Sequence, residues 1–99
     1  MPRCLRTPEV RRDLANIWQF IAEDNPMEAD RLLDQFDETF ARLAEFPELG
    51  GKRDDLRPGM RGFTVGKYII FYRVASTIDA IEILRIIHGA RHLPDQFPS

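Results

Sequence analysis

The sequence contains a single cysteine, Cys4, among its 99 residues. A lone cysteine cannot close an internal disulfide, and no companion cluster accompanies it to form a zinc site. No stretch approaches the ~18–20 consecutive apolar residues of a membrane span, and the first residues lack the charged-then-apolar layout of a secretory signal. The sequence therefore predicts a cytoplasmic protein with no zinc site at Cys4 and no membrane segment.

A large excess of charge of one sign is also missing, since the formal net charge is −2. This small value hides an asymmetry. Residues 1–50 carry six Lys/Arg and eleven Asp/Glu, a balance of −5, whereas residues 51–99 carry eight and five, a balance of +3. The positive half can face an anionic partner such as nucleic acid or an acidic protein surface. Dedicated nucleic-acid binders are usually far more basic, with a domain pI above ~9, so the charge indicates a partner without identifying it.

The rest of the composition, 43% hydrophobic and 30% charged residues, is typical of one globular domain over residues 1–99. Thr7-Pro8 and Asn25-Pro26 each place a capping side chain before a proline at a first helical position. Apolar residues at helical spacing follow both sites and predict helices from Pro8 to about Glu23 and from Pro26 to Phe46. The short link between them predicts an antiparallel helical hairpin.

Four short segments have the composition of β-strands. Residues 2–6 form a short alternating opening strand, and three β-like runs follow the helices at 61–65, 68–74 and 80–87. Gly66-Lys67 is a plausible two-residue turn between the first two of these runs. The resulting order, βααβββ, predicts an α+β domain in which the helical hairpin packs on an antiparallel sheet.

This order, together with the stretches FPELGGKRDDLRPGMRGFTVGKYIIFYRV and ILRIIHGARHL, resembles the RelE/ParE superfamily of bacterial type II toxins, most closely its ParE branch. The resemblance extends from the helix start at Thr7 to His92. It implies a cytoplasmic toxin that forms a hetero-oligomer with a ParD-like antitoxin, which neutralises it.

The two branches of the superfamily differ in mechanism. RelE-like members cleave messenger RNA in the ribosome, which requires a proton acceptor, cations and an acid for the leaving group. Where that branch has an arginine after a tyrosine, this chain has Ile69, and Phe97 stands near the place of the catalytic tyrosine. The resemblance therefore implies a ParE-like inhibitor that binds DNA gyrase and has no catalytic residues, no cofactor and no metal. Two alternatives stay open: an mRNA endonuclease that uses Arg61, Arg91 and His88, and a non-toxic member that only binds its antitoxin.

Five basic residues of the C-terminal half form the predicted target-binding set, which consists of Arg61, Arg73, Arg85, His88 and Arg91. If Arg61 and Arg73 point to the same side of the sheet as Arg85, the three form one basic patch. A competing interpretation of Arg85 is a salt bridge to an acid such as Glu82, because an arginine in an apolar row is costly unless it is paired. For His88 the alternative is a hydrogen-bonded histidine at a strand end.

Strict alternation along the last strand predicts which of its residues share a face. One face is predicted to hold Ile81, Ile83, Arg85 and Ile87, and the other Glu82, Leu84, Ile86 and His88.

The predicted antitoxin-binding residues are Trp18 and Phe20, at the two margins of the apolar stripe of the first helix. Toxins of this family bury a large apolar surface under their antitoxin, so the resemblance implies that some margin residues are more apolar than a monomer requires. Core packing is the competing interpretation of Trp18.

Overall fold

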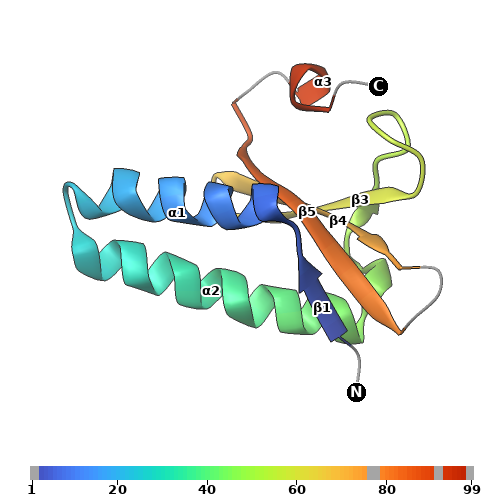
Figure 1. The fold of residues 1–99 in the computed structure, drawn as a ribbon, viewed down its shortest axis with the longest axis horizontal. Helices are drawn as coiled ribbons and strands as arrows, with labels where there is room; N and C mark the ends of the chain where they lie inside the picture. Colours follow the sequence, from blue (N-terminus) through green and yellow to red (C-terminus); the bar gives the residue numbers. More distant parts are fainter. Residues whose placement is uncertain (1–2, 76–78, 91–92, 98–99) are drawn as a thin grey trace.

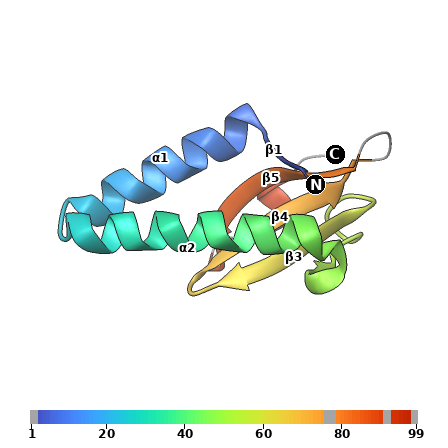
Figure 2. The same cartoon turned by 90° about the horizontal axis from the view of Figure 1, so that it is seen from below.

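The computed structural model describes residues 3–75, 79–90 and 93–97. Helices α1 and α2 form an antiparallel hairpin beside the sheet, and the hairpin extends beyond the sheet at the α1–α2 turn (Figures 1 and 2). Among the described residues, no helix is both long and apolar enough to cross a membrane. In chain order, the elements are β1 (Arg3–Arg6), α1 (Pro8–Ala22), α2 (Pro26–Glu45), the 3-10 helix η1 (Pro47–Leu49), β2 (Gly51–Lys52), β3 (Met60–Val65), β4 (Tyr68–Val74), β5 (Ala80–His88) and α3 (Leu93–Gln96).

Both long helices begin at the predicted capping residues. Thr7 Oγ1 accepts a hydrogen bond of 3.1 Å from the backbone N–H of Val10, and Asn25 Oδ1 accepts one of 3.2 Å from that of Glu28. These bonds satisfy N–H groups that have no partner inside the helix. The predicted helix starts are therefore confirmed.

The five strands form one sheet in the order β1-β5-β4-β3-β2. The predicted α+β fold and its order of elements are confirmed, with the short β2 as an additional strand. The prediction of a purely antiparallel sheet is wrong, because β1 pairs with β5 in parallel. Between β1 and β5 the chain forms the helical hairpin and strands β2 to β4. This long connection allows β5 to run beside β1 in the same direction, as parallel neighbours require.

A β-bulge in β5 changes which of its residues face the helices. Phe71 lies opposite Arg85 and Tyr72 opposite Ile83, so Leu84 is an extra residue in the ladder. The predicted strict alternation is therefore wrong beyond Ile83. The cluster on the helix side includes Ile81, Ile83 and Ile86, whereas the cluster on the opposite face includes Leu84 and Ile87.

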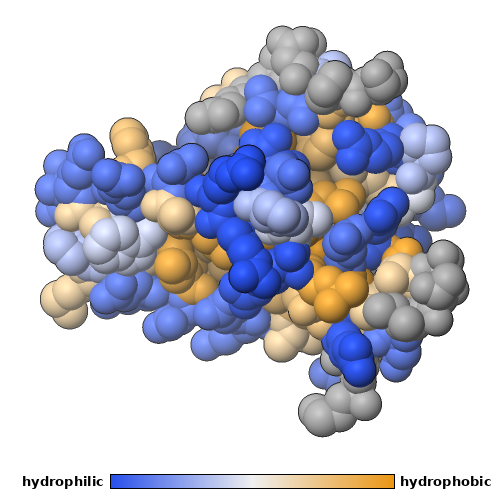
Figure 3. Space-filling view, viewed as in Figure 1, coloured by the Kyte–Doolittle hydropathy of each residue, from blue (hydrophilic) through white to orange (hydrophobic). Residues whose placement is uncertain are grey.

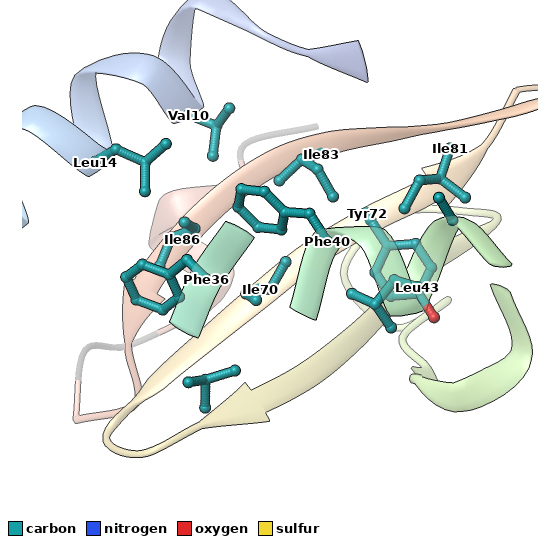
Figure 4. Close-up of a cluster of buried hydrophobic side chains, with 12 residues drawn as sticks. Val10, Leu14, Phe36, Phe40, Leu43, Ile70, Tyr72, Ile81, Ile83 and Ile86 are labelled. Carbon is teal, nitrogen blue, oxygen red and sulfur yellow. The ribbon is translucent and has the colours of Figure 1, made fainter. Parts of the chain in front are cut away.

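Two hydrophobic clusters lie on opposite faces of the sheet. The larger one joins the helical hairpin to the sheet, and Figure 4 shows Phe36 and Phe40 of α2 among the side chains of β4 and β5. The second cluster lies on the far face, where Phe97 packs edge-on against Phe71 with ring centroids 4.9 Å apart. The residues after β5 thus cover part of the face that the hairpin leaves open.

Candidate functional site

Arg85 is bound to Asp13 of α1. Its Nε donates to Asp13 Oδ2 at 2.7 Å and its Nη2 to Oδ1 at 3.0 Å, while the backbone N–H of Ile86 also donates to Oδ2, at 3.0 Å. The hydrogen bonds to Asp13 raise the pKa of Arg85 above its ordinary value. An ion pair of Arg85 is thus present, but the partner suggested by the sequence, Glu82, is wrong. Strict alternation places Arg85 on the face of Ile81 and Ile83, whereas the bulge pairs it with Phe71 of the far-face cluster, and Asp13 of α1 is nevertheless its partner.

Arg73 lies on the far face of the sheet. It stands directly opposite Glu82 on β5, and its Nε donates to Glu82 Oε1 at 2.9 Å. Arg73 also lies opposite Met60, a member of the far-face cluster. Because directly paired residues share a face, Arg73 points away from the helical hairpin.

Arg61 lies on the helix side of the sheet, opposite Tyr72. Its Nη1 donates to the backbone oxygen of Gly50 at 2.7 Å, so it connects β3 to the segment before β2. The hypothesis of one patch built from Arg61, Arg73 and Arg85 is therefore wrong, since Arg73 points to the opposite face.

His88 ends β5 and lies against Tyr68 of β4. The two rings meet edge-on, with centroids 5.4 Å apart, and the Nδ1 of His88 accepts a hydrogen bond of 3.1 Å from the backbone N–H of Ala90. His88 is thus hydrogen-bonded at a strand end, and its part in target binding stays a prediction. Arg91 and His92 lie outside the described residues.

A hollow of about 520 Å³ lies between α1 and the C-terminal half of β5. It brings together three of the predicted binding residues: Arg85, His88 and Phe20, whose side chain is 73% exposed. The other side chains in its wall come from α1, β4 and β5, and are Asp13, Asn16, Ile17, Tyr68, Ile86 and Ile87.

The sequence analysis missed Asp13, which organises this hollow. A signal for it was present: Asp13 lies three residues after Val10 and one before Leu14, both buried core residues of α1. An acid in that position lies close to the sheet, and a carboxylate withdrawn from water needs a cationic partner. The sequence alone does not say which arginine that partner is.

Trp18 lies on a different side of α1, in an apolar groove between the two helices. The groove has a volume of about 500 Å³ and is lined by Leu14, Ala15, Trp18, Gln19 and Leu33. Hydrophobic side chains reach the surface between α1 and α2 (Figure 3). Trp18 is 38% exposed, and its Nε1 donates to Asp30 Oδ1 at 2.8 Å. Core packing therefore does not account for this tryptophan, and Trp18 and Phe20 line two separate concave surfaces.

Known proteins similar to this chain share its length and fold. Residues 5–93 match the family model described as "ParE toxin of type II toxin-antitoxin system, parDE". The chain is 37% identical over 97 residues to Toxin ParE3 of Caulobacter vibrioides, which covers 97% of this chain and 95% of that protein.

Solved structures are similar over most of the chain as well. A chain of the chromosomal ParDE toxin–antitoxin system of P. aeruginosa has a TM-score of 0.72 at 24% identity and covers 89% of this chain and 96% of its own length. A chain of the RelBE2 toxin–antitoxin complex of Mycobacterium tuberculosis has a TM-score of 0.61 at 25% identity and covers 89% and 99%. The likeness therefore covers both helices and the sheet.

Proposed function

Because the chain belongs to the ParE toxin family of type II toxin–antitoxin systems, we propose that it inhibits DNA gyrase by binding it, with no turnover of its own, and that a ParD-like antitoxin neutralises it in the cytoplasm. Membership of the ParE branch, predicted from the sequence, is confirmed. Gyrase as the target is the finer step of this proposal, and it is an inference by analogy with the branch.

The observation that carries the proposal of binding without turnover is the position of Phe97. This residue stands near the place where the ribonuclease branch has a catalytic tyrosine, and it is 5% exposed within the far-face cluster. A phenyl ring packed against Phe71 neither donates nor accepts a proton. Ile69, which replaces the expected arginine, packs against the same cluster. Both positions therefore serve packing, which supports a binding mechanism.

The proposed target surface centres on the hollow beside β5. Arg85 and His88 form its contiguous part, whereas Arg61 and Arg73 lie elsewhere on the sheet. Arg85 uses Nε and Nη2 to hold Asp13, which leaves the N–H groups of Nη1 for an acceptor on the target. Asp13 thus fixes the guanidinium in place, so that less side-chain entropy is lost on binding.

The proposed antitoxin surface is the groove that contains Trp18. Its mostly apolar lining, made by four residues of α1 and one of α2, fits the apolar face of an amphipathic helix, a common mode of peptide recognition. Trp18 is a suitable anchor, because large aromatic side chains carry much of the binding energy of protein interfaces. Phe20 extends the apolar surface to the other side of α1.

The proposed target is tested by measuring supercoiling and DNA cleavage by purified gyrase in the presence of the purified chain, beside a cell-free translation assay. We expect loss of supercoiling or accumulation of cleaved DNA while translation continues. His88→Ala should weaken this effect, and Arg42→Ala, which removes an exposed charge from α2, should leave it intact.

Two results contradict the gyrase proposal. Halted translation with gyrase untouched would identify the ribosome as the target and return His88 to the set of candidate catalytic residues. A chain that affects neither assay, although folded and bound by its antitoxin, would be a member without toxicity.

A further inference from the structure

The outer edge of β1 has no neighbouring strand among the described residues. The sheet order places β1 at one end of the sheet, where it pairs with β5 on one side only. Such an edge presents main-chain N–H and C=O groups that can pair with another strand. Because β1 extends only from Arg3 to Arg6, the groups that this edge offers can be identified one by one.

Hydrogen bonds to β5 show which main-chain groups of β1 point outward. The N–H groups of Arg3 and Thr7 donate to carbonyl oxygens just before and within β5, at 3.0 and 3.2 Å. Because the groups of successive residues alternate in direction along a strand, Leu5 also points toward β5. The N–H and C=O groups of Cys4 and Arg6 therefore point away from the sheet, where the described part of the chain gives them no partner.

These outward groups determine how a second copy of β1 can pair with the first. In an antiparallel ladder, a hydrogen-bonded pair of residues exchanges two N–H···O bonds. Placing Cys4 opposite Arg6 of the second copy forms two such pairs, which use every outward group of both strands. The registers centred on Cys4 or on Arg6 each place a proline, Pro2 or Pro8, opposite the remaining residue, and proline has no N–H. The edge is therefore complementary to itself in one register.

The same register brings the two copies of Leu5 directly opposite each other. Leu5 lies beside Glu82 in the ladder with β5, and Glu82 lies beside Arg73 on the far face of the sheet. Leu5 is 38% exposed, so an apolar side chain lies at the open edge. Opposite residues of a non-hydrogen-bonded pair approach to about 4.5 Å between Cα atoms, so the two leucines would cover each other.

On the helix side of β1, a pocket of about 470 Å³ is lined by residues of β1 and α2. Its charged residues are Arg6, Asp37 and Glu45, so it carries one excess negative charge. Arg6 uses Nη2 to hold Asp37 at 2.7 Å, which leaves its other N–H groups for a second acceptor. Because Arg6 of the second copy lies opposite Cys4, which lines the pocket, pairing brings a second cation to the pocket that contains Glu45. The charges are therefore complementary as well.

We infer that two copies of this chain associate by antiparallel pairing of β1 with β1, with Cys4 opposite Arg6 and Leu5 opposite Leu5, so that one sheet continues across the dimer. This inference is independent of the proposed function, since it concerns the chain without its target or antitoxin. The pocket beside β1 shares no lining residue with the hollow between α1 and β5 or with the groove that contains Trp18, so pairing through β1 uses neither surface.

The contact is small, and the dimer is therefore expected to be weak. Each copy contributes one short strand and the rim of one pocket, less than the ~800 Å² per partner of a standard interface. We expect a dissociation constant of roughly 10–100 μM, measured by sedimentation equilibrium of the purified chain at concentrations from about 5 μM to about 1 mM. A chain that stays monomeric over this whole range would overturn the inference.

A charge placed at the centre of the contact tests which surface the copies use. Leu5→Lys puts two cations directly opposite each other and should weaken the dimer about tenfold or more. Met27→Lys is the matched control, because Met27 is 73% exposed and lies at the start of α2, at the end of the hairpin away from β1 (Figure 1). It should dimerise as the wild type does. If Leu5→Lys dimerises equally well, the copies associate through another surface and the inference is wrong.

Disulfide trapping in a Cys4→Ser background tests the register. Leu5→Cys puts the two thiols at directly opposed positions, whose Cα separation of about 4.5 Å lies within the disulfide range of about 4.4–6.8 Å. Arg3→Cys, on the same strand, puts them four residues apart along the ladder, on the order of 13 Å. With oxidised glutathione, Leu5→Cys should form a disulfide-linked dimer and Arg3→Cys should not. Equal cross-linking of both variants, or of neither, would overturn the pairing.

Discussion

At the scale of single residues, Asp13 links the first helix to the last strand of the sheet. One carboxylate accepts two bonds from Arg85 and one from the main chain of Ile86. The side chain of Asp13 is 13% exposed and that of Arg85 25%, so both charges are largely withdrawn from water. Removing one partner leaves the other poorly solvated, which is the usual reason that such pairs are sensitive to substitution.

Replacing Asp13 by alanine should lower the free energy of unfolding by about 2–4 kcal/mol, because it leaves the Arg85 guanidinium and the Ile86 N–H without their acceptor. Arg85→Ala should cost less, since Asp13 keeps its bond from Ile86. A double-mutant cycle in urea should then show coupling of about 1–2 kcal/mol between the two positions.

The pair Arg73–Glu82 provides a control for this prediction. It is a cross-strand ion pair of similar geometry, but the Arg73 side chain is 56% exposed. Exposed pairs contribute about 0–1 kcal/mol, so Glu82→Ala should change stability little. If Asp13→Ala and Glu82→Ala lowered the free energy of unfolding equally, Asp13 would be no more important than a surface carboxylate.

At the scale of elements, Tyr72 ties the centre of the sheet to the segment that follows α2. Its hydroxyl donates to the carbonyl of Pro47 at 2.5 Å and accepts from the N–H of Gly50 at 2.9 Å. The contact is so close that a Cβ at Gly50 would lie 2.5 Å from the hydroxyl oxygen, which requires glycine there. Burial raises the pKa of Tyr72 above its ordinary value.

Tyr72→Phe should destabilise the fold by about 1–2 kcal/mol, because two buried main-chain groups lose their partner. The loss should also depend on pH. The pKa of Tyr72 is raised in the folded chain, so its contribution is complete below the ordinary tyrosine pKa of about 10 and declines as the pH rises through the folded-state pKa. Thermal unfolding from pH 8 to 11 should therefore show the gap between wild type and Tyr72→Phe narrowing. A constant gap would contradict this assignment.

Patterns among neighbouring residues predicted the helices and strands well. The features that the sequence could not show depend on contacts between residues far apart in the chain. The caps at Thr7 and Asn25 predicted both helix starts because capping depends on a few adjacent residues. The parallel pairing of β1 with β5 joins residues about 77 positions apart, and no local pattern specifies it. The bulge at Leu84 adds one residue to the ladder. It therefore determines which residues of β5 face the helices, and so which of them form the candidate site.

At the scale of the whole molecule, α1 separates two concave surfaces. The groove toward α2 contains Trp18, and the hollow toward β5 contains Phe20 and His88. Because Trp18 and Phe20 are two residues apart on one helix, they point in different directions. If one antitoxin chain binds both residues, as we propose, it must bend around α1.

The far face of the sheet depends on the chain that follows β5. Phe97 is 5% exposed and contacts Phe71, and the guanidinium of Arg57 lies 5.6 Å from the Phe97 ring. Phe97→Ala should therefore lower the free energy of unfolding by about 2–4 kcal/mol, as expected for deleting a buried aromatic ring, when measured by urea denaturation. Phe46→Ala, which removes a 53% exposed ring, should change it by less than about 1 kcal/mol. If the two variants are equally stable, the C-terminal segment does not cover the far face in solution, and the buried position of Phe97 could no longer support a mechanism based on binding alone.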